Sequence, residues 1–483
     1  MTRLLSSVSF SFILLSACSH IQPEYISPDP ATNAAYDTSL QPEGSLAASQ
    51  INWQDYFIDE RLQLLIETAL ENNRNLHAAT ARIEQARARF RIQDSRRLPT
   101  VTATGNAVRS RVPTDSGSLG GVTGGGQGAN VPSSITFNNF DIGVGIASYE
   151  IDFWGRLSNL SEAARAEYLA TEAAQRAFYI SLIGDVASTY FDLIESKAQI
   201  ALAEDTMRSR EEGLRLAEIR LESGITSALD FHQSQALLTQ AQQALSNQKL
   251  LEAQNRNQLT VLIGGTYPQQ LPSGLSLGEQ TSSLRLDAGL PSDLLLVRPD
   301  IISAEQSLRS ASANIAVART AFFPTISLTG SGGVTSSELG DLFDTDSLTW
   351  RFGPSISLPI FDAGARKADL ALARAVEEEA VATYDLTIQN AFRDVSNSLA
   401  GRRWLAELVD ARLRNVEAQE QIARLAQLQY DEGVANYLEV LDAERNLFTA
   451  RQSLLQARRM EDQNSVSLFI ALGGGLSNTP SPN

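Results

Sequence analysis

The chain has very few of the residues that build catalytic or metal centres. Its 483 residues include one cysteine, Cys18, and three histidines, His20, His77 and His232. One cysteine excludes an intramolecular disulfide and a cysteine-based metal cluster. The histidines are far apart, and the chain has neither a His-Glu-x-x-His motif nor the pattern of a hydrolase triad. Glycines within 117–128 lack the Lys-Ser/Thr of a phosphate loop, so we expect a flexible surface loop there. The sequence predicts that the protein is not an enzyme.

Positive charge and long apolar runs are also scarce. The formal net charge is −17, which argues against nucleic acid as a partner because phosphates require a basic surface. Beyond the N-terminal segment no run of 18 apolar residues occurs, so we expect no transmembrane helix.

The N-terminus is typical of an exported protein. Residues 1–17 carry one charge, Arg3, and an apolar stretch from Val8 to Leu15, as in a signal peptide. The residues around Cys18 resemble a bacterial lipobox, in which the cysteine becomes the lipidated first residue of the mature protein. The alternative is an ordinary signal peptide followed by an incidental cysteine. By analogy with Gram-negative lipoproteins, Ser19 in place of Asp favours the outer membrane. A covalent lipid on Cys18 is the only non-protein group that we expect.

The sequence contains an internal duplication. Each half is too long for a solenoid repeat, so we expect two supersecondary units that pack against each other. The separation is 225 residues near the first strands and 209 further on, because the first half carries the glycine-rich insert. The matches are Leu98-Pro99-Thr100-Val101 with Phe323-Pro324-Thr325-Ile326, and Gly155, Gly224 and Gly264 with Gly364, Gly433 and Gly473.

Long helices are predicted in two windows without proline, between Pro132 and Pro268 and between Pro359 and Pro480. Apolar residues recur at seven-residue spacing on two adjacent tracks, which favours a closed wall of helices, although a two-helix coiled-coil hairpin has the same periodicity. A helix of about 68 residues is roughly 100 Å long. Tip turns at Gly224 and Gly433 separate the members of each pair of helices, which we place at 156–223, 227–263, 366–432 and 436–472.

Four segments alternate apolar and small polar residues, as membrane β-barrel strands do. Four strands cannot close a barrel, and an open sheet edge is not tolerated in lipid. Several copies must therefore pool strands: two copies give eight and three give twelve, which leave a lumen. We expect the strands at about 100–110, 136–151, 325–334 and 348–361.

The chain resembles the TolC-type outer-membrane efflux proteins, or outer membrane factors, and specifically the lipidated OprM-like branch of RND efflux systems. The resemblance covers nearly the whole mature chain. The motifs that carry it are Tyr149 to Arg156, Leu296 to Ile301 with Ala304-Glu305, Phe322-Phe323-Pro324, Leu358 to Asp362, and Tyr430 to Asp442.

The resemblance implies the fold class, an α+β membrane protein forming a trimeric 12-stranded transmembrane β-barrel with four strands per chain. A 12-helix periplasmic α-barrel continues it. The implied partners are two further copies of the chain, a periplasmic adaptor, an inner-membrane RND-type transporter and outer-membrane lipid. The expected organisation is a signal peptide at 1–17, a lipidated segment and equatorial region at 18–74, repeats at 75–289 and 290–475, and a disordered tail at 476–483.

The resemblance also implies a periplasmic gate. The apolar plug matches Leu438, the carboxylate ring matches Asp442, and Glu439 matches a second acidic position. Leu438 and Asp442 are one turn apart on one helix face. A coiled-coil core leucine and a solvated carboxylate are the alternatives. Asp230 and Tyr430 match a pair that holds the coils shut, but Ala435 stands where a basic latch residue is expected, so the complete latch does not carry over.

The sequence thus predicts a passive exit duct for small molecules, such as drugs and toxic compounds. A duct for type I protein secretion and a lipid-anchored coiled-coil scaffold without a pore are the alternatives. The four alternating segments argue against the scaffold.

Overall fold

The computed structural model describes residues 46–113, 134–280, 286–287 and 294–475. The predicted signal peptide, Cys18, the glycines within 117–128 and the tail at 476–483 lie outside the described residues. The described chain divides into two compact units. One contains Ala86–Tyr168 and Ser307–Ala380, and the other lies within Pro28–Gln85, Leu169–Gln306 and Val381–Asn483. Each unit therefore draws on both predicted repeats.

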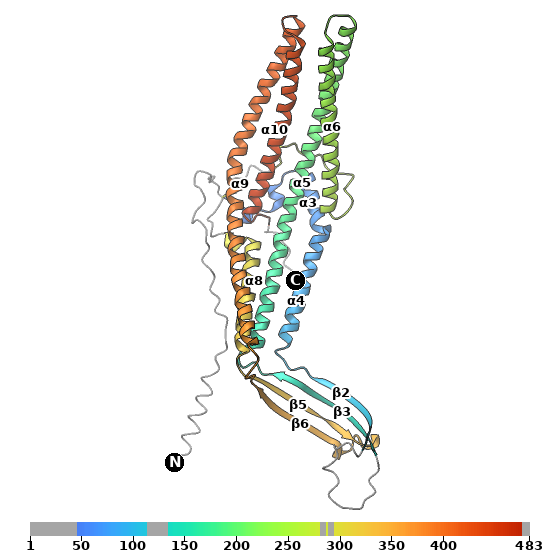
Figure 1. The fold of residues 1–483 in the computed structure, drawn as a ribbon, viewed down its shortest axis with the longest axis vertical. Helices are drawn as coiled ribbons and strands as arrows, with labels where there is room; N and C mark the ends of the chain where they lie inside the picture. Colours follow the sequence, from blue (N-terminus) through green and yellow to red (C-terminus); the bar gives the residue numbers. More distant parts are fainter. Residues whose placement is uncertain (1–45, 114–133, 281–285, 288–293, 476–483) are drawn as a thin grey trace, which may run out of the picture. The chain divides into compact units, whose positions relative to one another are not determined.

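The first unit contains a four-stranded antiparallel sheet (Figure 1). Its order is β2-β3-β5-β6, so each repeat contributes two adjacent strands. Ile142 pairs with Gly105 on one side and with Val334 on the other, and Val334 pairs with Leu348. A bulge lies between Ile146 and Tyr149 in β3. The strands are β2 (Thr102–Pro113), β3 (Ser134–Glu150), β5 (Thr325–Ser336) and β6 (Leu348–Ser357).

One face of this sheet is apolar. Directly paired residues share a face, so Ile142, Val334 and Leu348 lie together. Along β6 the apolar residues of this face are strongly exposed, with Trp350 at 78% and Phe352 at 65%. The intervening residues of β6, among them Arg351, face the other way. The sheet therefore has the apolar and polar faces that the alternation predicts.

The apolar face ends before the strands do. Toward the end of the β2–β3 hairpin, Phe137 lies on the otherwise polar face, directly opposite Ser110. Arg109 and Arg111 lie on the face that carries Ile142 further along the sheet. The apolar surface is therefore a band that stops short of this end.

β6 is shorter than predicted. It ends at Ser357, whereas the alternation suggested a strand to 361. Pro359 has no N–H to donate to a neighbouring strand and restricts the residue before it. Ile360 and Phe361, at 92% and 87% exposure, lie beyond the strand.

The sharp turn from β3 into the next helix explains the motif Tyr149 to Arg156. The Asp152 carboxylate accepts hydrogen bonds from the backbone N–H groups of Leu157 (2.9 Å) and Ser158 (2.8 Å), which caps the helix. The Trp154 indole donates to the Pro324 carbonyl at 2.8 Å. The motif thus joins the start of a helix to the other repeat.

The helices of the two repeats have the same lengths. α5 (Arg156–Glu222) and α9 (Ala365–Asp431) have 67 residues each, α6 (Ala228–Leu262) and α10 (Tyr437–Ala471) have 35, and α4 (Arg74–Ser95) and α8 (Pro299–Thr320) have 22. Among the described residues only α5 is long and apolar enough to cross a membrane, and its apolar window is 56% buried in the protein. Burial of that kind is expected of a helix that packs against others.

The two tip turns are the same motif. Gly224 and Gly433 have φ angles of 70° and 72°, which glycine adopts without strain. The residue after each glycine donates its N–H to the carbonyl five residues earlier, as in Ile225 to Arg220 (2.8 Å) and Val434 to Gln429 (2.9 Å). This is the Schellman arrangement that ends a helix.

Short elements at the other end of α6 and α10 form a packed belt. Buried Asp59 accepts hydrogen bonds from the Tyr190 hydroxyl and the Leu275 N–H, both at 2.9 Å. Tyr56 stacks on Phe469 with ring centroids 4.1 Å apart. The short elements are β1 (Leu46–Ala47), paired in parallel with β4 (Leu286–Asp287), the helices α2 (Trp53–Tyr56), α3 (Glu60–Asn72) and α7 (Leu294–Val297), and the 3-10 helix η1 (Ala48–Gln50).

Candidate functional site

Asp230 takes part in the cap at the start of α6. The Asp230 carboxylate accepts from the Thr226 hydroxyl and from the Ser227 N–H at 3.4 Å, while the Ser227 hydroxyl accepts from the Asp230 N–H. This reciprocal pair is a capping box, which fixes the first turn of the helix.

Tyr430 closes the end of α9 against α10. Its ring centroid lies 4.9 Å from the guanidinium carbon of Arg220 and 5.0 Å from the Tyr437 ring. Asp230 and Tyr430 line the same cavity of about 200 Å³. Among the described residues no hydrogen bond joins the two side chains, so the structure places them around one cavity without a direct latch.

The first turns of α10 have a packed face and a free face. Val440 and Ala443 are buried in a cluster with Ala426. Leu438, by contrast, is 43% exposed, and the Asp442 side chain is half-exposed. The free face of α10 therefore presents an apolar residue and a carboxylate one turn apart.

Two further residues join the predicted gate positions. Arg445 pairs with Asp442 at 2.7 Å, a contact that three-residue spacing on a helix permits. Asn436 caps α10 by accepting the Glu439 N–H at 3.2 Å, and Glu439 itself is exposed. Sequence reasoning missed Arg445, although its position three residues after Asp442 was a usable signal.

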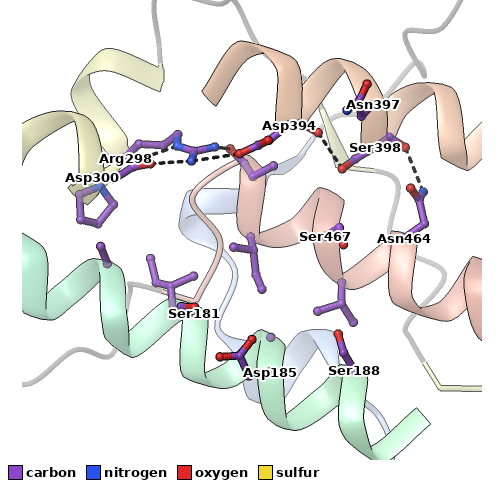
Figure 2. Close-up of a pocket in the computed structure, with 17 residues that line it drawn as sticks. Ser181, Asp185, Ser188, Arg298, Asp300, Asp394, Asn397, Ser398, Asn464 and Ser467 are labelled. Carbon is purple, nitrogen blue, oxygen red and sulfur yellow. Dashed lines mark hydrogen bonds and ion pairs between the residues drawn. The ribbon is translucent and has the colours of Figure 1, made fainter. Parts of the chain in front are cut away.

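A larger polar pocket of about 670 Å³ lies between α5, the start of α8, α9 and α10 (Figure 2). Ser and Asn side chains line much of it, together with Asp185 on α5, Asp300 on α8 and Asp394 on α9. Burial raises the pKa of the Asp185 carboxyl. Within the part of the chain that the structure describes, no group of three or more potential ligands could hold a metal ion.

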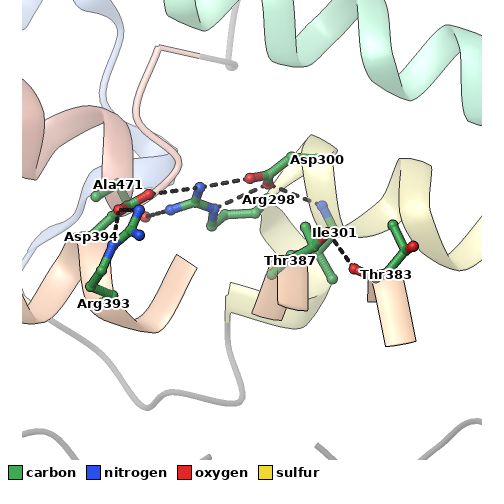
Figure 3. Close-up of polar contacts among 8 residues, drawn as sticks. All are labelled: Arg298, Asp300, Ile301, Thr383, Thr387, Arg393, Asp394 and Ala471. Carbon is green, nitrogen blue, oxygen red and sulfur yellow. Dashed lines mark hydrogen bonds and ion pairs between the residues drawn. The ribbon is translucent and has the colours of Figure 1, made fainter. Parts of the chain in front are cut away.

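Arg298 explains the motif Leu296 to Ile301. Its guanidinium binds the Asp300 carboxylate through two nitrogens, at 3.1 and 2.7 Å, and donates to the Ala471 carbonyl at 3.2 Å (Figure 3). Asp394 lies 3.7 Å away. The arginine thus ties the start of α8 to α9 and to the C-terminal end of α10, where a cation is favourable.

The sheet with one apolar face, together with two pairs of long helices of equal length, defines the class of a membrane channel protomer. The chain belongs to the outer membrane efflux protein family, whose family model, Outer membrane efflux protein, matches residues 65–265 and 290–474.

Individual proteins agree with this assignment. The solvent efflux pump outer membrane protein SrpC of Pseudomonas putida is 40% identical over 475 residues, which are 97% of each chain. The cation efflux system protein CusC of Escherichia coli is 37% identical over 469 residues, covering 96% of this chain and 97% of CusC. The open state of the MtrE outer membrane channel of Neisseria gonorrhoeae has a TM-score of 0.83 at 36% identity, covering 94% of this chain and 98% of MtrE.

These comparisons confirm the resemblance to outer-membrane efflux proteins and the predicted fold class. The chain has the four-stranded sheet that this fold class requires of each chain. They confirm that the protein is an outer membrane component of efflux and not an enzyme.

Proposed function

We propose that this protein is the outer-membrane exit duct of a tripartite efflux pump. The observation that carries the proposal is the four-stranded sheet with an apolar and a polar face. Because an open edge is not tolerated in lipid, the sheet must continue into further copies. Three copies give a twelve-stranded barrel with a lumen, and the helix pairs of three copies give a twelve-helix tube in the periplasm.

The proposed assembly includes a lipid anchor and two protein partners. Acylation of Cys18 attaches the chain to outer-membrane lipid, and a periplasmic adaptor joins the trimer to an inner-membrane RND-type transporter. The lipid is not the only attachment, because the closed barrel itself spans the membrane.

We propose small organic molecules as the cargo. Solvents are named for SrpC and cations for CusC. The sequence has three methionines, Met1, Met207 and Met460, and these form no thioether ladder that would suit soft metal ions. Passive exit of toxic organic compounds accords best with this composition.

The proposed gate is the free face of α10. Three copies of Leu438 around an axis form an apolar ring that excludes water, and three copies of Asp442 form an acidic ring one turn away. Glu439, Asp230 and Tyr430 belong to the same region, and the turns at Gly224 and Gly433 hold the helix ends. The half-exposed state of Leu438 and Asp442 in a single chain supports this assignment, because both remain available to face a lumen.

The test is the double substitution Leu438→Ala with Asp442→Ala, measured as resting conductance in planar bilayers. Loss of the apolar ring should raise conductance, and loss of the carboxylates should lower cation preference. Cells should become sensitive to vancomycin. Glu439→Gln is the matched control and should have a smaller effect, because the Glu439 side chain points about 100° away from Leu438 around the helix axis. Unchanged conductance and selectivity in an assembled trimer would remove Leu438 and Asp442 from the gate.

A further inference from the structure

Arg210 of α5 is a buried cation with unused hydrogen-bond donors. It is 3% exposed, and burial lowers the pKa of its guanidinium. One nitrogen, Nη1, donates to the Leu237 carbonyl of α6 at 2.6 Å, and the guanidinium carbon lies 5.1 Å from the Phe448 ring centroid of α10. Nε and Nη2 are buried without a partner. Buried donors without an acceptor cost free energy of folding, and more so on a charged group. A functional role for Arg210 would explain why the protein bears this cost.

The carboxylate that acts on the charge of Arg210 is on α10. Glu444 lines the same cavity of about 200 Å³ as Arg210, and burial raises the pKa of its carboxyl while Arg210 opposes that shift. Among the described residues no ion pair within 4.0 Å joins the two side chains. The two charges therefore attract each other across a cavity instead of in direct contact.

The side of α10 that faces this cavity is turned by about 110° around the helix axis from the free face that carries Leu438 and Asp442. Tyr437, Leu441 and Glu444 line the cavity, at the helical spacing that places them on one side. The Tyr437 hydroxyl lies 2.7 Å from the position that a Cβ would occupy on Gly213, so α5 and α10 approach closely at this level. Any force on Glu444 therefore acts on the helix that carries Leu438 and Asp442.

We propose that Arg210 is a positioning residue, which holds α10 against α5 and α6 through Glu444 and so keeps the free face of α10 in the closed position. This inference rests on the proposed gate. The cavity between Arg210 and Glu444 matters for this role, because charges that attract across a gap oppose outward movement of α10 without fixing the helix rigidly. Arg210 serves as the fixed side of the pair, since its hydrogen bond to the Leu237 carbonyl of α6 holds its guanidinium in place, and its contact with Phe448 is a second link to α10.

The experiment compares Arg210→Met, Glu444→Gln and the double variant in planar bilayers. Methionine keeps a long unbranched side chain against Phe448, and glutamine keeps the shape of glutamate. Each single variant should raise resting conductance about tenfold, within the range of coupling energies between sites. The double variant should leak no more than the stronger single variant, because each substitution already removes the same attraction. Heat stability of the trimer is measured in parallel.

The matched control is the exposed pair Arg451–Glu420, which joins α10 to α9 at 2.7 Å. Arg451→Met and Glu420→Gln should leave conductance unchanged, because exposed pairs contribute little. If Arg210→Met does not assemble, Glu444→Gln decides the question alone, and unchanged conductance refutes the proposal. Effects of the two substitutions that multiply in the double variant also refute it. A leaky Leu438→Ala/Asp442→Ala trimer beside a silent Glu444→Gln trimer would reject this inference and keep the gate.

Discussion

Phe352→Arg tests which face of the sheet meets lipid. The apolar residues of β6 run from Leu348 to Ile356, and the eight steps between these two residues span about 26 Å at about 3.3 Å each. Strand tilt shortens the band to roughly 20 Å along the membrane normal, close to the roughly 25 Å band of membrane barrels. Phe352 lies four residues from each end and is 65% exposed in the single chain, so it should lie near the midplane.

An arginine at this depth costs about 2–4 kcal/mol per chain, or about 6–12 kcal/mol for three copies. The control, Thr349→Arg, adds the same charge to the opposite face, which already carries Arg351. The measurement is the yield of trimer in mild detergent together with urea-dependent unfolding in lipid vesicles. Phe352→Arg should lower both the yield and the stability, whereas Thr349→Arg should alter conductance and leave assembly intact. The reverse outcome would refute the assignment of the two faces.

Three further predictions concern the belt and the anchor. Gly264→Ala should lower the thermal stability of the trimer by at least about 2 kcal/mol per chain. The φ angle of Gly264 is 69°, and an added Cβ would lie 2.1 Å from the Asn72 carbonyl oxygen. Gly265→Ala is the control, because a Cβ on Gly265 would meet nothing within 4 Å. Burial raises the pKa of Asp462 from 3.8 to about 7, so the native state binds an extra proton in this window and stability should fall as pH rises from about 4 to 7. Asp462→Asn keeps an acceptor for the Gly278 N–H and should remove this dependence of stability on pH. At pH 8 the free energy of unfolding, measured in urea titrations, should rise by up to about 4 kcal/mol per chain. An unchanged pH dependence would contradict the raised pKa of Asp462. Cys18→Ser should abolish acylation, as measured by mass, and leave a detergent-stable trimer; retained lipid would place the anchor elsewhere.

Local signals made the helices predictable. A glycine with positive φ follows the end of each long helix, and no proline interrupts the helix. Helix-forming composition and these glycines therefore located the ends to within two residues. The strands were less certain, because alternation continues past the last paired residue. The expected end of β6 was wrong for that reason, since Ile360 continues the pattern after Pro359 has ended the pairing.

Contacts between distant residues were not predictable from one sequence. The motif around Arg298 was visible, but its acceptor at Ala471 lies 173 residues away. Arg210 gave no signal in the sequence, since a lone arginine in a long helix is ordinarily solvated. Its burial depends on Leu237 and Phe448, which only the packing of α6 and α10 brings to it.

The duplication is retained in the backbone and lost in the side chains that we assign to the gate. α6 begins 209 residues before α10, so Leu229 corresponds to Leu438 and Gln233 to Asp442. Leu229 is 63% exposed, so the apolar position is kept on both helices, but the carboxylate is present on one only. Arg210 likewise has an uncharged counterpart, Gln419. Equal helix lengths are needed wherever both pairs complete one wall, whereas the proposed acidic ring and the proposed restraint by Arg210 each need one residue per chain. This division accounts for equal lengths alongside divergent charges, and it assigns the proposed gate to the second repeat.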